Sequence, residues 1–170
     1  PLLEKANPMI SPNPSKAPWY FMGIQELLIN LHPLFVSFIV PLSVFLFLFF
    51  IAKTKIAEAK VGVWFYSVKG KQITILSAIF AAILSFVLII ILERIAHFNN
   101  LDLPLFIRTG IIPLLLYFIP SLGFIIYLKK VRKADKTEIQ IGIMTMILSS
   151  YIIMSFIGIF LRGEGMHLIF

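Results

Sequence analysis

Histidine is the residue type in this sequence best suited to redox or metal chemistry, and the positions of its three copies limit what they can bind. Haem held by two histidines between packed membrane helices needs both histidines inside the spans. His32 precedes Pro33 at the edge of an apolar run, His97 lies in a short polar stretch, and His167 lies in the tail. We therefore expect no haem ligand and no metal ligand from this chain, and we expect each ring to be a polar tip at a membrane interface.

Other catalytic constellations are missing from the sequence. The chain has no cysteine, which excludes disulfides, iron–sulfur ligation, zinc-thiolate sites and covalently attached haem. It has no phosphate-binding glycine loop, no paired carboxylates within an apolar run, and no serine near a base. We expect Ser149, Ser150 and Ser155, which fall in the last apolar run, to pack or to form hydrogen bonds between helices.

Two charged residues each have two interpretations. Glu26 follows Trp19 by two helical turns and lies on nearly the same face. A carboxylate at a membrane interface can accept a proton, or it can simply belong to a solvated polar face. Arg108 lies just inside an apolar run. It either extends to the lipid headgroups or pairs with a partner chain, through a salt bridge or a haem propionate.

The elements that must position these residues are membrane spans. Hydrophobic residues make up 59% of the 170 positions, against roughly 45–50% in soluble domains. Four runs each hold about the 20 apolar residues that a bilayer requires, so we predict an all-α integral membrane protein. Pro113 and Pro120 predict a kinked third span whose freed carbonyls are satisfied by neighbouring helices. The predicted spans are residues 34–52, 73–92, 105–128 and 139–161.

The segment before the first span divides into two parts. Residues 1–18 contain five prolines and predict an extended arm on the outer side. Residues 19–32 predict a short amphipathic helix at the membrane interface, with Trp19 and Tyr20 as its anchor and Pro18 at its first position. Residues 33–170 then form the membrane domain. Because the chain opens without methionine or a basic leader, we expect the natural N-terminus to lie upstream or to have been processed.

Charge predicts the orientation. The net charge is +7, and membrane proteins collect Lys and Arg in their cytoplasmic loops, so we expect no nucleic acid partner. The loops after the first and third spans would then be cytoplasmic, with both termini and the interfacial helix outside. These two loops hold ten of the 15 basic residues, which are Lys53, Lys55, Lys60, Lys69, Lys71, Lys129, Lys130, Arg132, Lys133 and Lys136.

The proline-rich arm leads into Ala17-Pro18-Trp19-Tyr20, followed by Phe21, a short helix and a span. The segment from Pro8 to Pro33 resembles the loop and helix before the sixth membrane span of cytochrome b. The same segment occurs in subunit IV of photosynthetic cytochrome bf-type complexes, where the motif is Pro-Glu-Trp-Tyr. The tail at residues 162–165, Arg-Gly-Glu-Gly, is similar to the ending of a divergent bacterial branch. That branch also contains the motifs Lys-Ala-Pro-Trp-Tyr-Phe and Gln-Glu-Leu-Leu, which occur here at residues 16–21 and 25–28. Over the spans themselves the resemblance is only topological.

The resemblance implies a subunit of a cytochrome bc-type quinol:electron-acceptor oxidoreductase in the bacterial inner membrane. This chain would supply the C-terminal half of cytochrome b, with Pro18, Trp19, Tyr20 and Phe21 contacting the quinone in a pocket on the outer side. Haem b would sit on a partner chain of the N-terminal cytochrome b type. A Rieske subunit, a cytochrome c subunit, or both would complete the complex, which shares the quinol and is surrounded by lipid.

One departure from the family pattern concerns the proton. In the family, the glutamate of Pro-Glu-Trp-Tyr is thought to take a proton from quinol, and this sequence has Pro18 at that place. Glu26 is the only carboxylate between Glu4 and Glu58, although it lies about 10 Å further along the helix axis. Either Glu26 substitutes as the proton acceptor, or the site works differently, or it is inactive.

Two other classes of function compete with this interpretation. The chain can be a structural membrane anchor for another respiratory redox complex, without a quinone site of its own. It can also be a small transporter, which the sequence disfavours because the spans lack ionisable residues at mid-membrane depth. In the redox interpretation the chain is not catalytic alone.

Overall fold

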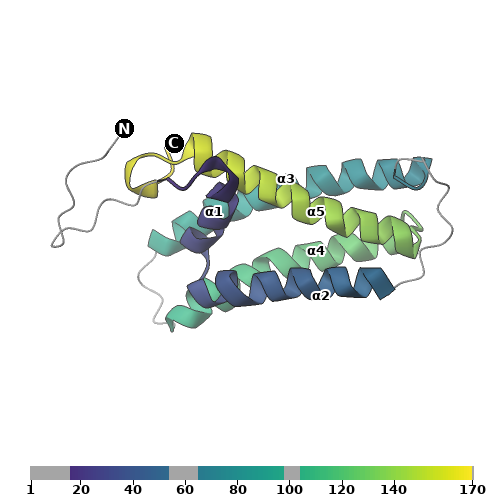
Figure 1. Cartoon of the computed structure of the whole chain (residues 1–170), viewed down its shortest axis with the longest axis horizontal. Coiled ribbons are helices and arrows are strands. Elements are labelled where there is room, and N and C mark those ends of the chain that lie inside the picture. Colours follow the sequence, from purple (N-terminus) through teal and green to yellow (C-terminus); the bar gives the residue numbers. More distant parts are fainter. Residues whose placement is uncertain (1–15, 54–64, 98–103, 170) are drawn as a thin grey trace.

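The computed structural model describes residues 16–53, 65–97 and 104–169, and within them it shows helices joined by short connections (Figure 1). Five α-helices are accompanied by short 3₁₀ and π-helical turns. In chain order the elements are the 3₁₀ turn Trp19–Phe21, α1 (Met22–Asn30), the π turn Phe35–Ile39, α2 (Val40–Lys53), α3 (Val68–His97), the π turn Ile107–Ile111, α4 (Ile112–Lys130), α5 (Lys136–Phe156), the π turn Ile157–Leu161 and the 3₁₀ turn Glu164–Met166.

Four of these helical segments are long and apolar enough to cross a membrane, which confirms the predicted all-α membrane fold. No more than 28% of any span's most apolar window is buried inside the chain, so most of the span surface faces lipid or partner chains. The spans lie close to their predicted positions and are Phe35–Lys53, Val68–Glu93, Ile107–Lys130 and Lys136–Leu161.

Two spans begin earlier than hydropathy predicted because polar caps extend them. The Ser67 hydroxyl accepts a hydrogen bond from the backbone N–H of Gly70 at 2.8 Å, which caps the start of α3. Asp135 and Glu138 form a reciprocal capping box at the start of α5. These caps precede the apolar runs, so the hydrophobic pattern alone does not include them.

The closest helix pair in the bundle is α3 with α5, and small residues allow the approach. Ser77, Ala81 and Ser85 of α3 are buried, as expected for a membrane helix interface. A Cβ placed on Gly142 of α5 would lie 3.0 Å from the Ser77 hydroxyl. The Ser149 hydroxyl donates to the carbonyl of Ala78 on α3 at 2.8 Å.

The other two serines singled out in the last span behave differently from each other. Ser150 of α5 shares a hydrogen bond with the Tyr117 hydroxyl of α4 at 3.0 Å, so it joins two helices as Ser149 does. Ser155 donates to the Tyr151 carbonyl within its own helix and packs closely against Gly23 of α1. The expectation that these serines pack or form hydrogen bonds between helices therefore agrees with the structure.

Proline shapes the start of the third span. Pro113 has no N–H, so the carbonyl of Thr109 lacks its usual helical donor. The backbone N–H of His32 donates to this carbonyl at 2.8 Å, and the π turn Ile107–Ile111 immediately precedes the proline. The freed carbonyl is thus satisfied by a neighbouring segment, as predicted. At Pro120 the α4 helix continues without interruption.

The ends of the bundle differ in character (Figure 1). Helix α1, the end of α5 and the described tail after it lie at one end. The opposite end holds the close of α2 and α4 and the start of α3 and α5, where the described basic residues of the two loops are found. The described basic residues thus lie at the end of the bundle opposite α1 and the C-terminal tail, while the side of the membrane that each end faces stays a prediction. The extended arm predicted for residues 1–18 and most of the first basic loop lie outside the described residues.

Candidate functional site

Three aromatic side chains project from the 3₁₀ turn at the α1 end of the bundle. Trp19, Tyr20 and Phe21 are exposed by 74%, 53% and 51%. Their rings contact one another in sequence, with centroids 5.6 Å apart for the first pair and 5.1 Å for the second. Pro18 has an extended backbone, and its carbonyl accepts the N–H of Phe21 at 2.8 Å, which closes the turn. The turn thus presents a continuous aromatic surface that the described residues leave uncovered.

The backbone beneath these rings is attached to α5. The Tyr151 hydroxyl donates to the carbonyl of Tyr20 at 2.6 Å. Gly23, the second residue of α1, lies so close to α5 that an added Cβ would come within 2.7 Å of the Tyr151 ring and 2.8 Å of the Ser155 hydroxyl. The aromatic side chains therefore face outward from a backbone that α5 holds in place.

A buried ion cluster connects α1 to the end of the chain. Arg162 donates from Nε to Oε2 of Glu26 at 3.0 Å and from Nη2 to Oε1 of the same carboxylate. Its Nη1 donates to Glu93 at 2.8 Å and to the carbonyl of Met166 at 2.8 Å. The Arg162 side chain is fully buried, Glu26 is 1% exposed and Glu93 is 19% exposed. Asn30 donates to Oε1 of Glu26 at 2.9 Å, so both oxygens of this carboxylate are occupied.

The electrostatics of this cluster favour a fixed cation. Burial by itself lowers the pKa of the Arg162 guanidinium, but the hydrogen bonds and charges of Glu26 and Glu93 outweigh it and hold the pKa above its ordinary value. One guanidinium therefore serves two carboxylates, and with all three groups ionised the cluster carries one net negative charge.

The interpretation of Glu26 as a solvated polar residue is wrong. Glu26 turns inward together with Met22 and Gly23, and Arg162 supplies the counter-charge that a buried carboxylate requires. Ile24 and Leu28 are exposed, as an apolar face toward the membrane requires in an interfacial helix. The role of Glu26 as proton acceptor stays a prediction.

Arg162 is the residue that sequence reasoning missed. The chain turns back on itself after Arg162 and fixes its position. The Gly163 N–H donates to the carbonyl of His167 at 2.9 Å, and the Ile169 N–H donates to the carbonyl of Leu161 at 3.0 Å. Gly165 has a φ of 68°, a left-handed conformation that glycine adopts without strain. The sequence feature that could have indicated its role is an arginine at the end of an apolar span, followed by Gly-Glu-Gly.

The other candidates with described side chains are His32, His167 and Arg108, while the side chain of His97 lies outside the described part of the chain. The described parts of the chain contain no group of three or more residues able to hold a metal ion. His32 packs edge-on against Phe35 and Phe106, and the His167 side chain is exposed. Arg108 is partly buried, and its Nε has no hydrogen-bond partner among the described residues.

Comparisons with profiles of known protein families, with characterised proteins and with solved structures found no match for this chain. The fold and the four apolar helices define its class as a multi-pass, all-α membrane protein.

Proposed function

We propose that this chain is a membrane subunit of a cytochrome bc-type quinol:electron-acceptor oxidoreductase of the bacterial inner membrane. It contributes the C-terminal cytochrome b half and one wall of the quinol pocket on the outer side. The observation that carries this proposal is the exposed aromatic surface of Trp19, Tyr20 and Phe21, which lies at the end of the bundle away from the basic loops.

The aromatic surface suits a flat, apolar ring such as a quinone head. Aromatic rings pair favourably in offset or edge-on contacts, and ligand sites are typically concave and lined by apolar and aromatic groups. The Trp19–Phe21 turn supplies one such wall but no opposite wall. A partner chain must complete the pocket, which fits a separate chain of the N-terminal cytochrome b type that carries haem b. A Rieske subunit, a cytochrome c subunit, or both would accept the electrons.

In this proposal the residues below the aromatic surface position it. Arg162 holds Glu26, and with it α1, against the bundle. Glu26 is the candidate proton acceptor on this chain. For Glu26 to take a proton from quinol, one of its bonds to Arg162 or Asn30 must open, and Glu93 can keep the guanidinium paired while this happens.

The test begins with the native complex. The chain, purified from its own membranes in mild detergent, is expected to bring with it a b-type haem protein whose haem is reduced by added quinol. Recovery of this chain without a haem protein would contradict the redox proposal.

A matched pair of substitutions then tests the aromatic surface. Loss of one aromatic contact of about 0.5–1.5 kcal/mol predicts that Phe21→Leu raises the KM for quinol about two- to twelvefold. The control is Phe118→Leu on α4, since both side chains are 51% exposed. A haem-containing complex in which both variants oxidise quinol equally well would assign this chain the alternative role, that of a structural anchor.

A further inference from the structure

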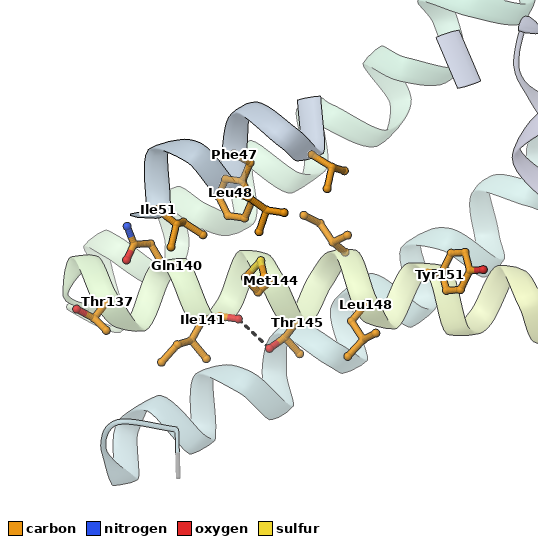
Figure 2. Close-up of a pocket in the computed structure, with 12 residues that line it drawn as sticks. Phe47, Leu48, Ile51, Thr137, Gln140, Ile141, Met144, Thr145, Leu148 and Tyr151 are labelled. Carbon is orange, nitrogen blue, oxygen red and sulfur yellow. Dashed lines mark hydrogen bonds between the residues drawn. The ribbon is translucent and has the colours of Figure 1, made fainter. Parts of the chain in front are cut away.

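An apolar cleft of about 630 Å³ separates α2 from α5 (Figure 2). Leu48 and Ile51 project into it from α2, and Met144 projects from α5. The cleft extends along α5 from Thr137 to Tyr151. It is distinct from the aromatic surface described above, and it lies along the membrane-spanning part of both helices.

The cleft exists because α2 is joined to the bundle mainly at its start. In the π turn before α2, Phe35 and Val36 are buried, and the Phe35 ring packs on Gly110. From Val40 to Lys53, by contrast, no residue is buried. The body of α2 therefore stands away from α5, and in a membrane the space between them must be filled.

The chemistry of the lining calls for a hydrocarbon. The Thr145 hydroxyl already donates to the carbonyl of Ile141 (Figure 2), so the middle of the cleft offers apolar side chains and a satisfied hydroxyl. Polar groups gather at the ends: Thr137 and Gln140 at one, and the Tyr151 hydroxyl, which is bonded to Tyr20, at the other. An occupant needs a long apolar body and a polar group at one end.

The size of the cleft suits one acyl chain. From Thr137 to Tyr151 the helix rises about 21 Å, at 1.5 Å per residue, which exceeds the roughly 15 Å of a single leaflet. The volume of about 630 Å³ lies in the range of sites that bind one small molecule.

Basic residues at one end of the cleft favour a lipid with an anionic headgroup. The end of the cleft marked by Ile51 and Thr137 is flanked by Lys53, the last residue of α2, and by Lys136, the first residue of α5, both exposed. The nearby acid Glu138 is already engaged by the capping box and by Lys69. Basic residues beside a gap between membrane helices are typical binding sites for anionic lipid headgroups.

We propose that the cleft between α2 and α5 retains one anionic phospholipid, with an acyl chain between the helices and its phosphate near Lys53 and Lys136. This site does not depend on the proposed redox function.

The experiment measures lipid retention by the full chain, purified in whatever complex it forms and exchanged into detergent with equal amounts of phosphatidylglycerol and phosphatidylcholine. Native mass spectrometry is expected to find phosphatidylglycerol retained preferentially. Leu48→Trp projects a larger ring into the cleft and should reduce retention. Leu46→Trp is the matched control, because Leu46 lies on the same helix outside the cleft lining and is 43% exposed against 46% for Leu48.

The headgroup contact is tested separately at exposed positions, where folding is unaffected. Lys53→Gln and Lys136→Gln should each reduce phosphatidylglycerol retention about fivefold, with Lys130→Gln at the end of α4 as the control. Equal retention of the two lipids, or equal lipid loss in Leu48→Trp and Leu46→Trp, would overturn the proposal. A photo-cross-linker at position 48 that captures another polypeptide instead of lipid would also overturn it.

Discussion

At the scale of single residues, the most informative group is the buried pair of Arg162 and Glu26 with Glu93 beside it. Taking charges out of water is unfavourable unless each is paired and hydrogen-bonded. Here the guanidinium makes bonds to two carboxylates and a carbonyl. Removing one member of the cluster is therefore more destabilising than replacing the whole cluster by apolar residues, because it leaves the charge of its partner buried and uncompensated.

This reasoning predicts the effect of Arg162→Met. The variant leaves Glu26 without a cation, and breaking a buried pair in this way typically destabilises a protein by about 3–5 kcal/mol. Thermal unfolding of the purified chain should show a clear drop in Tm, with Arg132→Met at the basic end as the control. A combined Arg162→Met, Glu26→Met variant should recover part of the loss. A single variant as stable as the control would show that the pair contributes little.

A second residue-scale prediction concerns the proton. If Glu26 accepts the quinol proton, Glu26→Gln should slow quinol oxidation per haem roughly 10²-fold, the lower end of general base catalysis. Glu93 keeps the Arg162 guanidinium paired in this variant, so the assembled complex should still contain haem. Glu93→Gln is the matched control, since Glu93 contacts the same guanidinium. Unchanged turnover in Glu26→Gln would leave this residue as a structural partner of Arg162 alone.

At the scale of elements, the contact between α1 and α5 depends on glycine. Gly23 faces the Tyr151 ring and Ser155, and Gly158 faces Met22 in the same way, with an added Cβ 2.9 Å from the Met22 methyl group. Small residues at both positions let α1 lie close to the bundle, which in turn fixes the turn that carries the aromatic side chains.

Gly23→Ala tests this contact. The new methyl group overlaps the Tyr151 ring, and overpacking of this kind costs about 1–3 kcal/mol. The expected result is a lower Tm. At Gly123 of α4, by contrast, an added Cβ meets nothing within 4 Å, so Gly123→Ala should leave stability unchanged or raise it by about 0.5–1 kcal/mol. Equal effects of the two substitutions would contradict a close α1–α5 contact.

At the scale of the whole molecule, the open question is which end of the bundle faces the cytoplasm. The chain contains no cysteine, so a thiol reagent would label only an introduced cysteine and would show which side of the membrane that position faces. Under the positive-inside rule, an impermeant maleimide added to intact cells should label His167→Cys at the terminal end but not Lys133→Cys at the basic end. Both side chains are exposed, so accessibility to the reagent is comparable. Labelling at 133 and not at 167 would reverse the orientation.

The four spans and the short helix before the first span could be predicted from the sequence. Hydropathy and charge decide these features locally, residue by residue along the chain. The sequence also indicated the proline effect in the third span, since a missing N–H at Pro113 is a local fact.

The burial of Glu26 could not be predicted from the sequence. The periodicity of residues 19–32 predicted an interfacial amphipathic helix, in which Glu26 was either a proton acceptor or part of a solvated polar face. The ion pair that buries Glu26 joins it to Arg162, 136 positions away in the sequence, and no local pattern contains such a pairing. A buried carboxylate requires a paired, hydrogen-bonded counter-charge, and only the folded chain brings Arg162 to Glu26.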